Sequence, residues 1–561
     1  ADAWSRIDPK KDGWDSEAIS AAASTKLKRL AKALEKPAEL GATDFSFVVA
    51  DTFVGGALRP EVLKTVFRSG EFSVSRGEVT AAKSRGLRDT LKGLMAVFDP
   101  SGPVQAELKL YRIEGLPGGV RASVLAHITG RGGDDRLQMN AEWVTLWTDD
   151  GDDPKLKSIE VISYEECRRL AGGGDPLFED STASVFGSEP VYREQLLRST
   201  DHWRARIARD FGLDVVANHG MAIGDVNGDG LDDIYLCQQG GLPNRLFLRG
   251  QDGGLRDFTE QSGTGWLDYC ASALILDFDN DGDRDLVVSQ DFKVLFMDNL
   301  GGAKFEFAFG RGLHAQTFSI VASDYDNDGD LDLYLCGYNP AADRSESGSM
   351  GEPIPYHDAR NGGRNMLLRN DGGWEFNDVT EELGLGENNN RFSFAASWVD
   401  YDRDGDQDLY VANDYGRNNL YRNDRIGGGG DGKFRDVAGE LGVEDMSAGM
   451  SASWGDHNRD GSLDLYVSNM FSSAGNRITY QRQFKPGADS DVIAGYRRHA
   501  RGNSLFEGAA GGRPFRDVSV AAGVTMGRWA WGSRFADLDN DGWEDLVVAN
   551  GFISTPDTGD L

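Results

Sequence analysis

The sequence predicts a mainly β protein, in which a β-propeller of six to seven blades follows a smaller α+β domain. Three observations predict this fold. The chain has 561 residues, which is too many for one hydrophobic core. An Asp-rich motif recurs six times after about residue 215. The pattern of apolar residues also changes near residue 175. We therefore place one domain at residues 1–175 and a repeat domain at residues 176–561.

The first domain has the pattern of two helices followed by a sheet. Apolar residues from Ile19 to Leu34 recur at helical spacing, and Pro37 ends that helix. A second helix is predicted over residues 87–98. Stretches of alternating polarity separated by Gly- and Asp-rich turns follow, and they predict an antiparallel meander. The predicted strands are residues 104–113, 122–129, 137–148 and 157–164. A curved sheet wrapped on a helix, as in the NTF2-like group, would fit this order.

The repeated motif reads Asp-x-(Asp/Asn)-x-Asp-Gly-x-x-Asp, and a short apolar strand follows each copy. The copies begin 52, 47, 76, 56 and 81 residues apart. A second phrase lies between the copies, in the form Asn-x-Leu and then Phe-x-Asp, as at Asn365 and Phe376. Each period therefore holds four short strands, which is typical of a propeller blade.

The motif has the spacing of a calcium loop. Alternate side chains in a tight loop point to one side, so positions one, three and five converge, while the glycine at position six permits a sharp turn. The carbonyl at position seven and the Asp at position nine would complete an all-oxygen shell, which Ca²⁺ prefers. Mg²⁺ is a second choice, and zinc would need His or Cys. No Glu stands at position twelve and no long helices flank the loop, so it is not an EF-hand.

We predict about six calcium sites, one in each loop. Their predicted ligands are Asp225, Asn227, Asp229, Leu231 and Asp233; Asp277, Asp279, Asp281, Asp283 and Asp285; Asp324, Asp326, Asp328, Asp330 and Asp332; Asp400, Asp402, Asp404, Asp406 and Asp408; Asp456, Asn458, Asp460, Ser462 and Asp464; and Asp537, Asp539, Asp541, Trp543 and Asp545. His457 stands at position two, which points away from the ion. We interpret it as structural or solvated.

The loops and the strand phrases resemble FG-GAP/VCBS repeats. Such repeats build the propellers of integrin α-subunits and of bacterial relatives of cartilage acidic protein. The resemblance covers residues 215–561 and implies a calcium-stiffened propeller that presents a face to proteins or glycans. The last repeat lacks its outer two strands. We expect residues 175–215 to supply them and close the ring, because Leu177-Phe178-Glu179-Asp180 resembles the strand phrase.

Composition excludes several classes of protein. The formal net charge is −32, which disfavours nucleic acid and anionic lipid as partners. No apolar run is long enough to span a membrane. Four cysteines are too few for a fold held by disulfides. We expect buried thiols, with one disulfide involving Cys270 as the alternative. The start at Ala1 suits a mature chain after signal removal, or a shortened one.

Two repeats are stretched by insertions near residues 337–363 and 470–502, and long loops on a rigid scaffold often carry function. The second insertion is basic and aromatic. It suggests a protein or anionic glycan partner, and internal ion pairing is the alternative. The predicted partner-binding residues are Arg477, Tyr480, Arg482, Arg497, Arg498, His499 and Arg501.

We therefore predict a calcium-binding scaffold or binding module that is secreted, periplasmic or on the cell surface, where calcium reaches millimolar levels. The alternative is a polysaccharide-active enzyme of the lyase type, with Tyr480, Arg497 and His499 as the place to look. The sequence has no nucleophile elbow, zinc motif or P-loop, which favours binding over catalysis. A third possibility gives the N-terminal domain a small-molecule pocket.

Overall fold

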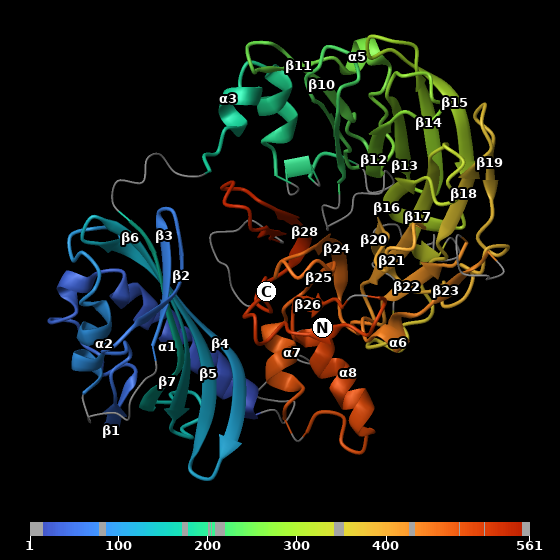
Figure 1. The fold of residues 1–561 in the computed structure, drawn as a ribbon. Coiled ribbons are helices and arrows are strands. Elements are labelled where there is room, and N and C mark those ends of the chain that lie inside the picture. The colour runs from blue at the N-terminus through green and yellow to red at the C-terminus, as the bar shows by residue number, and fades with distance from the viewer. Residues whose placement is uncertain are drawn as a thin grey trace. The chain divides into compact units, whose positions relative to one another are not determined.

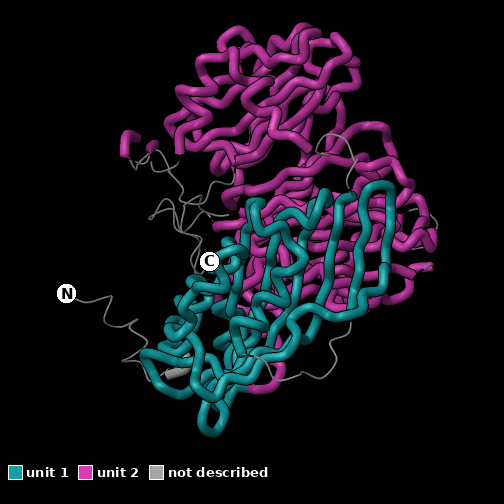
Figure 2. Tube along the Cα trace, turned by 90° about the vertical axis from the view of Figure 1, so that its left-hand side faces the viewer, with its two compact units in different colours: residues 1–177, 473–488, 560 teal, residues 178–472, 489–559, 561 magenta. Residues whose placement is uncertain are grey.

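The fold is known from a computed structural model. It describes residues 15–77, 86–170, 178–199, 202–203, 205–207, 219–340, 353–425, 432–481, 483–509 and 511–551. The chain forms two compact units (Figure 2). Unit 1 comprises residues 1–177 and 473–488, and almost all of the rest belongs to unit 2. Among the described residues, no helix has the length and apolar character that crossing a membrane requires.

Unit 1 is a seven-stranded sheet with helices. The sheet runs in the order β2-β3-β7-β6-β5-β4, all antiparallel, and β1 pairs with β7 in parallel. Every second residue of β6 from Leu137 to Trp147 is buried, as the alternating pattern predicts. Helices α1 and α7 both contact β4. The elements are α1 (Asp15–Leu34), η2 (Pro37–Glu39), β1 (Val49–Gly55), β2 (Lys64–Ser69), β3 (Phe72–Arg76), α2 (Leu87–Met95), β4 (Gln105–Leu116), β5 (Gly119–Gly132), β6 (Asp135–Trp147), β7 (Leu156–Arg169) and α7 (Ser473–Ile478).

Unit 2 confirms the mainly β prediction. Its described residues form five four-stranded antiparallel sheets and one two-stranded pair, and successive sheets follow one another around the unit (Figure 1). The first strand of each sheet contacts the first strand of the next, in the series β8, β12, β16, β20, β24 and β28. Short helices α5 (Thr259–Ser262) and α6 (Ala438–Leu441) follow the outermost strands of the first and fourth sheets, and α8 (Ser490–Ala500) lies in the second insertion.

The sheets of unit 2 are built from consecutive strands. Their bounds are β8 (Met221–Gly224), β9 (Asp233–Leu236), β10 (Arg245–Arg249) and β11 (Leu255–Asp257); β12 (Cys270–Leu276), β13 (Asp285–Gln290), β14 (Lys293–Asn299) and β15 (Phe305–Gly312); β16 (Ala315–Ser323), β17 (Asp332–Pro340), β18 (Met366–Asn370) and β19 (Phe376–Asp378); β20 (Ser393–Val399), β21 (Asp408–Asn413), β22 (Asn419–Asn423) and β23 (Phe434–Asp436); β24 (Gly449–Gly455), β25 (Asp464–Asn469), β26 (Ser504–Glu507) and β27 (Arg516–Asp517); and β28 (Ala530–Ala536) with β29 (Asp545–Asn550).

The prediction that residues 175–215 supply two closing strands is wrong for the described residues 178–199. They form α3 (Thr182–Phe186) and the helical turn η3 (Tyr192–Leu196). Phe186 and Val191 pack on Phe247 and Leu255 of the first sheet, with the Phe186 and Phe247 rings edge to face at 5.1 Å. This packing of apolar side chains from a helical segment determines the structure here, rather than the short strand phrase at Phe178 to Asp180. Leu177 and residues 208–215 lie outside the described residues.

Candidate metal centres

The six acidic loops share one backbone conformation. The glycine at position six has a positive φ in every loop, from 83° to 98°. Position four is left-handed as well, as at Asn280 (φ 61°) and Arg403 (φ 64°). Asn tolerates this conformation better than most residues, but the motif alone did not predict it for position four. Two left-handed residues two positions apart fold each loop tightly enough for its side chains to converge.

The first Asp of each loop holds the turn together. One of its oxygens accepts a hydrogen bond from the backbone N–H of the glycine at position six, at 2.8–3.2 Å in all six loops. In most loops its other oxygen accepts from the N–H of position five, as from Asp328 to Asp324 at 3.0 Å. These bonds aim the remaining carboxylate lone pairs into the loop.

The Asp at position nine ties each loop to its sheet. One oxygen of Asp285 accepts from the N–H of Phe278 at position two (2.8 Å), and the other accepts from the N–H of Asn299 at the end of the third strand (3.0 Å). The first five loops repeat both bonds. In those five sheets the Asp is fully buried. The sequence predicted only a ligand at this position, and the structure adds this anchoring role.

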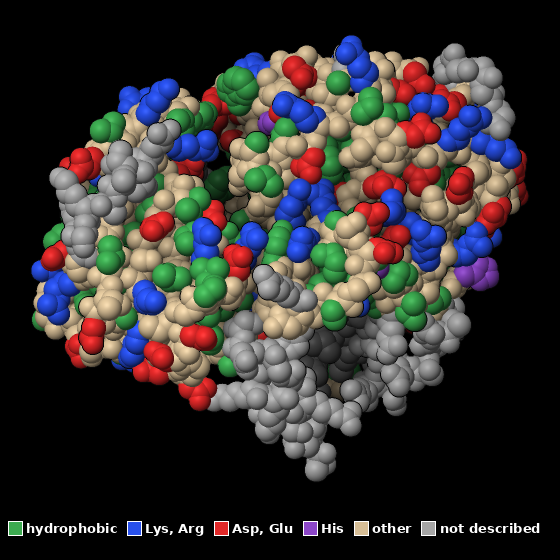
Figure 3. Space-filling view, turned by 90° about the horizontal axis from the view of Figure 1, so that it is seen from below, with side chains coloured by type: hydrophobic (Ala, Val, Ile, Leu, Met, Phe, Trp, Pro, Cys, Tyr) green, Lys and Arg blue, Asp and Glu red, His purple; other side chains and the backbone are tan. Residues whose placement is uncertain are grey.

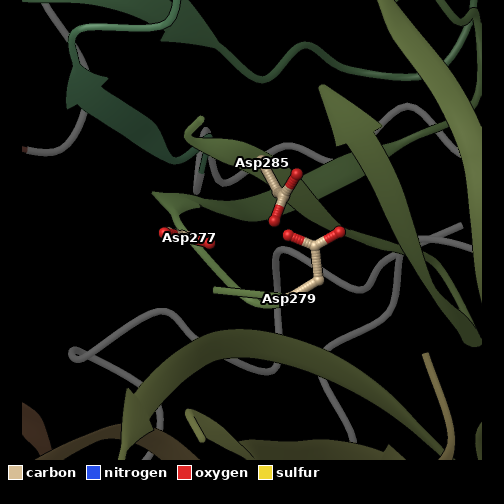
Figure 4. A group of neighbouring side chains, drawn as sticks. All are labelled: Asp277, Asp279 and Asp285. Atoms are coloured by element: carbon tan, nitrogen blue, oxygen red, sulfur yellow. The ribbon is translucent and has the colours of Figure 1, made fainter. Parts of the chain in front are cut away.

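Carboxylates gather in four of the six loops. In the second loop, single oxygens of Asp277, Asp279 and Asp285 lie within 4.8 Å of one another, and Asp279 and Asp285 point toward each other (Figure 4). The equivalent trio recurs in the third and sixth loops, and the fourth gathers its first, third and fifth Asp. Several Asp clusters of this protein could therefore hold metal ions. The other groups are Asp324, Asp326 and Asp332; Asp400, Asp402 and Asp404; and Asp537, Asp539 and Asp545.

The first and fifth loops differ. Position three is Asn227 in one and Asn458 in the other, and each side-chain amide donates to the Asp at position five, at 3.3 and 3.2 Å. Within the described residues, neither loop brings three acidic groups together. Replacing one carboxylate by an amide removes a charge and leaves a weaker cation site.

The clustered carboxylates are strained electrostatically. Burial, with a smaller contribution from neighbouring carboxylates, raises the pKa of Asp285 to about 7 and the pKa values of Asp332 and Asp408 to about 8. Burial likewise raises the pKa of Asp326 and Asp402. A bound cation would reverse both effects, because it replaces lost hydration and neutralises the repulsion.

Whether a cation fits these loops can be judged from buried carboxylate oxygens that accept no hydrogen bond. One oxygen each of Asp277, Asp326 and Asp402 is buried and accepts no hydrogen bond in the part of the chain that the structure describes. Such atoms are rare in folded proteins and need an explanation. A hard cation coordinated by oxygens supplies one, and these residues therefore fit Ca²⁺.

A further acidic residue enters the second loop from outside the motif. Asp298, next to last in β14, has an oxygen within 4.8 Å of oxygens of Asp279 and Asp281. The same strand position holds Arg369 in the third sheet and Arg422 in the fourth, paired with Asp371 and Asp424. Asp298 directly precedes Asn299 in the sequence, but its place beside the loop can be recognised only when the third strands of the sheets are aligned.

His457 is half-buried and is held by a hydrogen bond within its own loop. Its Nδ1 lies 2.6 Å from an oxygen of Asp464, the ninth residue of the same loop. This hydrogen bond raises the pKa of His457, even though burial opposes the shift. The imidazole thus competes with any cation for that carboxylate.

Comparison with known proteins agrees with this geometry. The FG-GAP-like repeat family matches residues 225–288, 277–335 and 400–467. The chain contains FG-GAP-like repeats. The matched ranges contain the first, second, third, fourth and fifth acidic loops. No curated protein matches the chain.

Solved structures share parts of the FG-GAP-repeat chain at low identity. An Agrocybe aegerita lectin that recognises non-reducing terminal N-acetylglucosamine is 16% identical, with a TM-score of 0.32 over 59% of this chain and 75% of the lectin. A structure of BBS1N in complex with ARL6DN, soaked with lead, is 8% identical, with a TM-score of 0.23 over 64% of this chain and 88% of that one.

The predicted partner-binding residues of the second insertion divide between the two units. In unit 1, Arg477 is buried and pairs with Glu17 at 3.0 Å, and the guanidinium of Arg112 lies 4.0 Å from the ring of Tyr480. Arg482 lies outside the described residues.

In unit 2, Arg498 pairs with Asp445 at 2.5 Å, and Arg498 and Arg501 share Asp517 at 3.1 and 3.0 Å. His499 is buried beneath Tyr356 and Tyr415, and Arg497 also lies on α8. Internal ion pairing, the alternative considered from the sequence, thus describes Arg477, Arg498 and Arg501. On the face shown in Figure 3, basic side chains likewise lie among acidic ones. Of the trio suggested for a lyase, Tyr480 belongs to unit 1, and Arg497 and His499 belong to unit 2.

The four cysteines are free thiols. Cys237, Cys270 and Cys336 are buried in or next to strands, as predicted, and Cys167 is partly exposed. The side-chain amide of Asn244 donates to the sulfur of Cys270 at 2.9 Å. Burial raises the pKa of Cys270 to about 12, so this thiol stays protonated and unreactive.

Proposed function

We propose that this FG-GAP-repeat protein is a calcium-stiffened β-propeller that works outside the cytoplasm as a binding or scaffold module for proteins or glycans. The observation that carries the proposal is the convergence of buried, partnerless carboxylate oxygens in successive loops, as at Asp277, Asp326 and Asp402. Calcium is the cation that such all-oxygen loops prefer. The four-stranded sheets in series support a propeller, with six blades if the β28–β29 pair is completed.

The loops are not equivalent as calcium sites. The second, third, fourth and sixth gather three carboxylates each, whereas the first and fifth have an amide at position three. We expect about six ions, with the first and fifth loops filling last. Calcium loops of this kind fill at the millimolar calcium of secreted, periplasmic or cell-surface environments, which supports that location.

The test measures bound metal and partner binding together. Elemental analysis of purified protein should find calcium, and the chelator EGTA should release it. A screen of immobilised proteins and glycans should then retain partners with calcium and lose them with EGTA. Absence of any bound alkaline-earth ion would contradict the metal part of the proposal. Retention that EGTA leaves unchanged would contradict its calcium dependence.

A further inference from the structure

An open cavity of about 480 Å³ lies on the first sheet of unit 2, beside the helical segment that caps it. One wall comes from residues 189–195 together with Trp203, and the other from residues 242–245 and Asp257, at and before β10 and β11. The segment lies near α3 and β11 in Figure 1. This volume is within the range of ligand sites in proteins.

The two walls are fixed to each other by Gln195, which is 6% exposed. Its side-chain N–H donates to the carbonyl of Pro243 at 2.9 Å and to Gln238 at 3.2 Å. Its oxygen accepts two hydrogen bonds from the guanidinium of Arg245, at 2.9 and 2.6 Å. The cavity is therefore built into the structure before any ligand arrives.

The charge of the cavity is negative. Arg245 also pairs with Asp257 at 3.0 Å, so these two charges cancel. Two carboxylates remain in the lining, those of Glu189 and Glu194. Neither has a side-chain hydrogen bond or ion pair among the described residues.

Two arginines lie close in sequence to these carboxylates. Arg193 and Arg198 each follow one of them by four residues, but neither lines the cavity. Neither arginine pairs with Glu189 or Glu194 among the described residues, and exposed pairs at that spacing would be weak.

The rest of the lining is apolar. It consists of Trp203, Val191, Leu242 and two prolines, Pro190 and Pro243. An indole attracts a cation to its face, and the apolar walls suit a hydrocarbon stem. Anionic sugars or phosphates would meet unpaired carboxylates instead. A ligand with a positive head on an apolar stem fits both halves of the lining.

We propose that this cavity binds a lysine or arginine side chain of a partner protein. The inference rests on the proposed binding function and narrows it to a protein with an exposed basic residue. Carboxylates would hold the cationic head, and Trp203 would cover its stem. Charge attraction across such a site also accelerates encounter with a basic partner.

The experiment titrates the full, calcium-loaded chain with acetyl-Gly-Lys-Gly-amide and acetyl-Gly-Arg-Gly-amide, followed by ligand-observed NMR. We expect saturable binding that weakens between 0.05 and 0.5 M NaCl, because salt screens the pairing. The double variant Glu189→Gln/Glu194→Gln should weaken binding by about fivefold or more. Trp203→Ala should weaken it by a similar factor, and Trp203→Phe by less.

The matched control is Glu382→Gln, which removes one exposed charge elsewhere on unit 2. It should bind the peptides as the unaltered protein does. Equal melting temperatures would show that all variants fold. No saturable binding by the unaltered protein, equal binding of acetyl-Gly-Glu-Gly-amide, or binding unchanged in the double variant would each overturn the inference. A partner that is retained with calcium while the basic peptides fail to bind would leave the proposed function standing.

Discussion

The side-chain amide of Asn370, at the end of β18, donates to the backbone carbonyl of Phe278 in the acidic loop of the preceding sheet, at 2.9 Å. The N–H of the same Phe278 donates to Asp285, the ninth residue of that loop. The same bond recurs in two other sheets, each time to the second residue of the acidic loop of the preceding sheet. Asn299 donates to the carbonyl of Val226 at 2.9 Å, and Asn423 donates to that of Tyr325 at 3.0 Å. Each of these loops is therefore connected both to its own sheet and to the next one.

This connection predicts that Asn370→Ala destabilises unit 2. The variant removes a buried donor and leaves the Phe278 carbonyl without it, which costs about 1–3 kcal/mol in the free energy of unfolding. Urea unfolding followed by circular dichroism measures the change. The control is Asn377→Ala, which removes an exposed amide that bonds Asp371 and should cost less than about 0.5 kcal/mol. Equal losses in the two variants would contradict a special role for the connection between sheets.

Calcium removal should lower the melting temperature. A site filled at a hundred times its Kd stabilises the folded state by about 2.7 kcal/mol, and several sites add. We expect EGTA to lower the Tm by at least about 5–10 °C in a calorimetric scan. Mg²⁺ at the same concentration should restore less of it, because it needs a tighter octahedron. Full restoration by Mg²⁺ would argue against loops that select calcium.

The raised pKa values predict how stability depends on pH without metal. Asp285, Asp332 and Asp408 have folded pKa values of about 7 to 8, above the ordinary value of 3.8. The folded state then binds more protons than the unfolded state, so this contribution is fully present below pH 4 and is lost as pH rises through 7 to 8. In EGTA, stability should fall between pH 5 and 8.

Calcium should reverse this trend, because it binds the ionised carboxylates. Its affinity should rise over the same pH window. Tm measurements at several pH values with EGTA and with calcium separate the two behaviours. Parallel pH profiles in both conditions would mean that these carboxylates do not hold the ion.

Asp298 should strengthen the second loop as a calcium site. Asp298→Asn removes one of the carboxylates around Asp279 and Asp281. We expect the affinity of one site to fall by about three- to tenfold, which is about 0.7–1.4 kcal/mol. Competition with a calcium dye measures it. Asp252→Asn, an exposed carboxylate of the first sheet paired with Arg256, is the matched control and should leave all sites unchanged.

The motif was enough to predict the acidic loops and their strands, because Asp spacing and the glycine at position six determine the turn locally. Asp298 and the hydrogen bond from Asn370 to Phe278 could not be predicted in this way, since they depend on which strands become neighbours. The helical cap over residues 182–196 was missed for a related reason. Its apolar residues match helical spacing, but only the surface around Phe247 determines where they pack. The basic residues of the second insertion were interpreted by composition, whereas their partners Glu17, Asp445 and Asp517 lie far away in sequence.

The pair between Arg477 and Glu17 yields the last prediction, on unit 1. The Arg477 side chain is 9% exposed, and its guanidinium contacts the Glu17 carboxylate at 3.0 and 3.3 Å. Gln481 donates to the same carboxylate at 3.3 Å. Glu17→Gln removes the carboxylate charge from beside the buried guanidinium and should destabilise the protein by about 2–3 kcal/mol, because breaking a buried ion pair from one side costs more than the intact pair gains. The exposed Glu39→Gln is the control for the loss of one charge. Adding Arg477→Met to Glu17→Gln should recover part of the loss, since the buried positive charge that Glu17 balanced is then absent. Urea unfolding measures the unaltered protein, Glu39→Gln, both single variants Glu17→Gln and Arg477→Met, and the double variant. A double variant that loses the sum of the two single losses would show that the two side chains do not act as a pair.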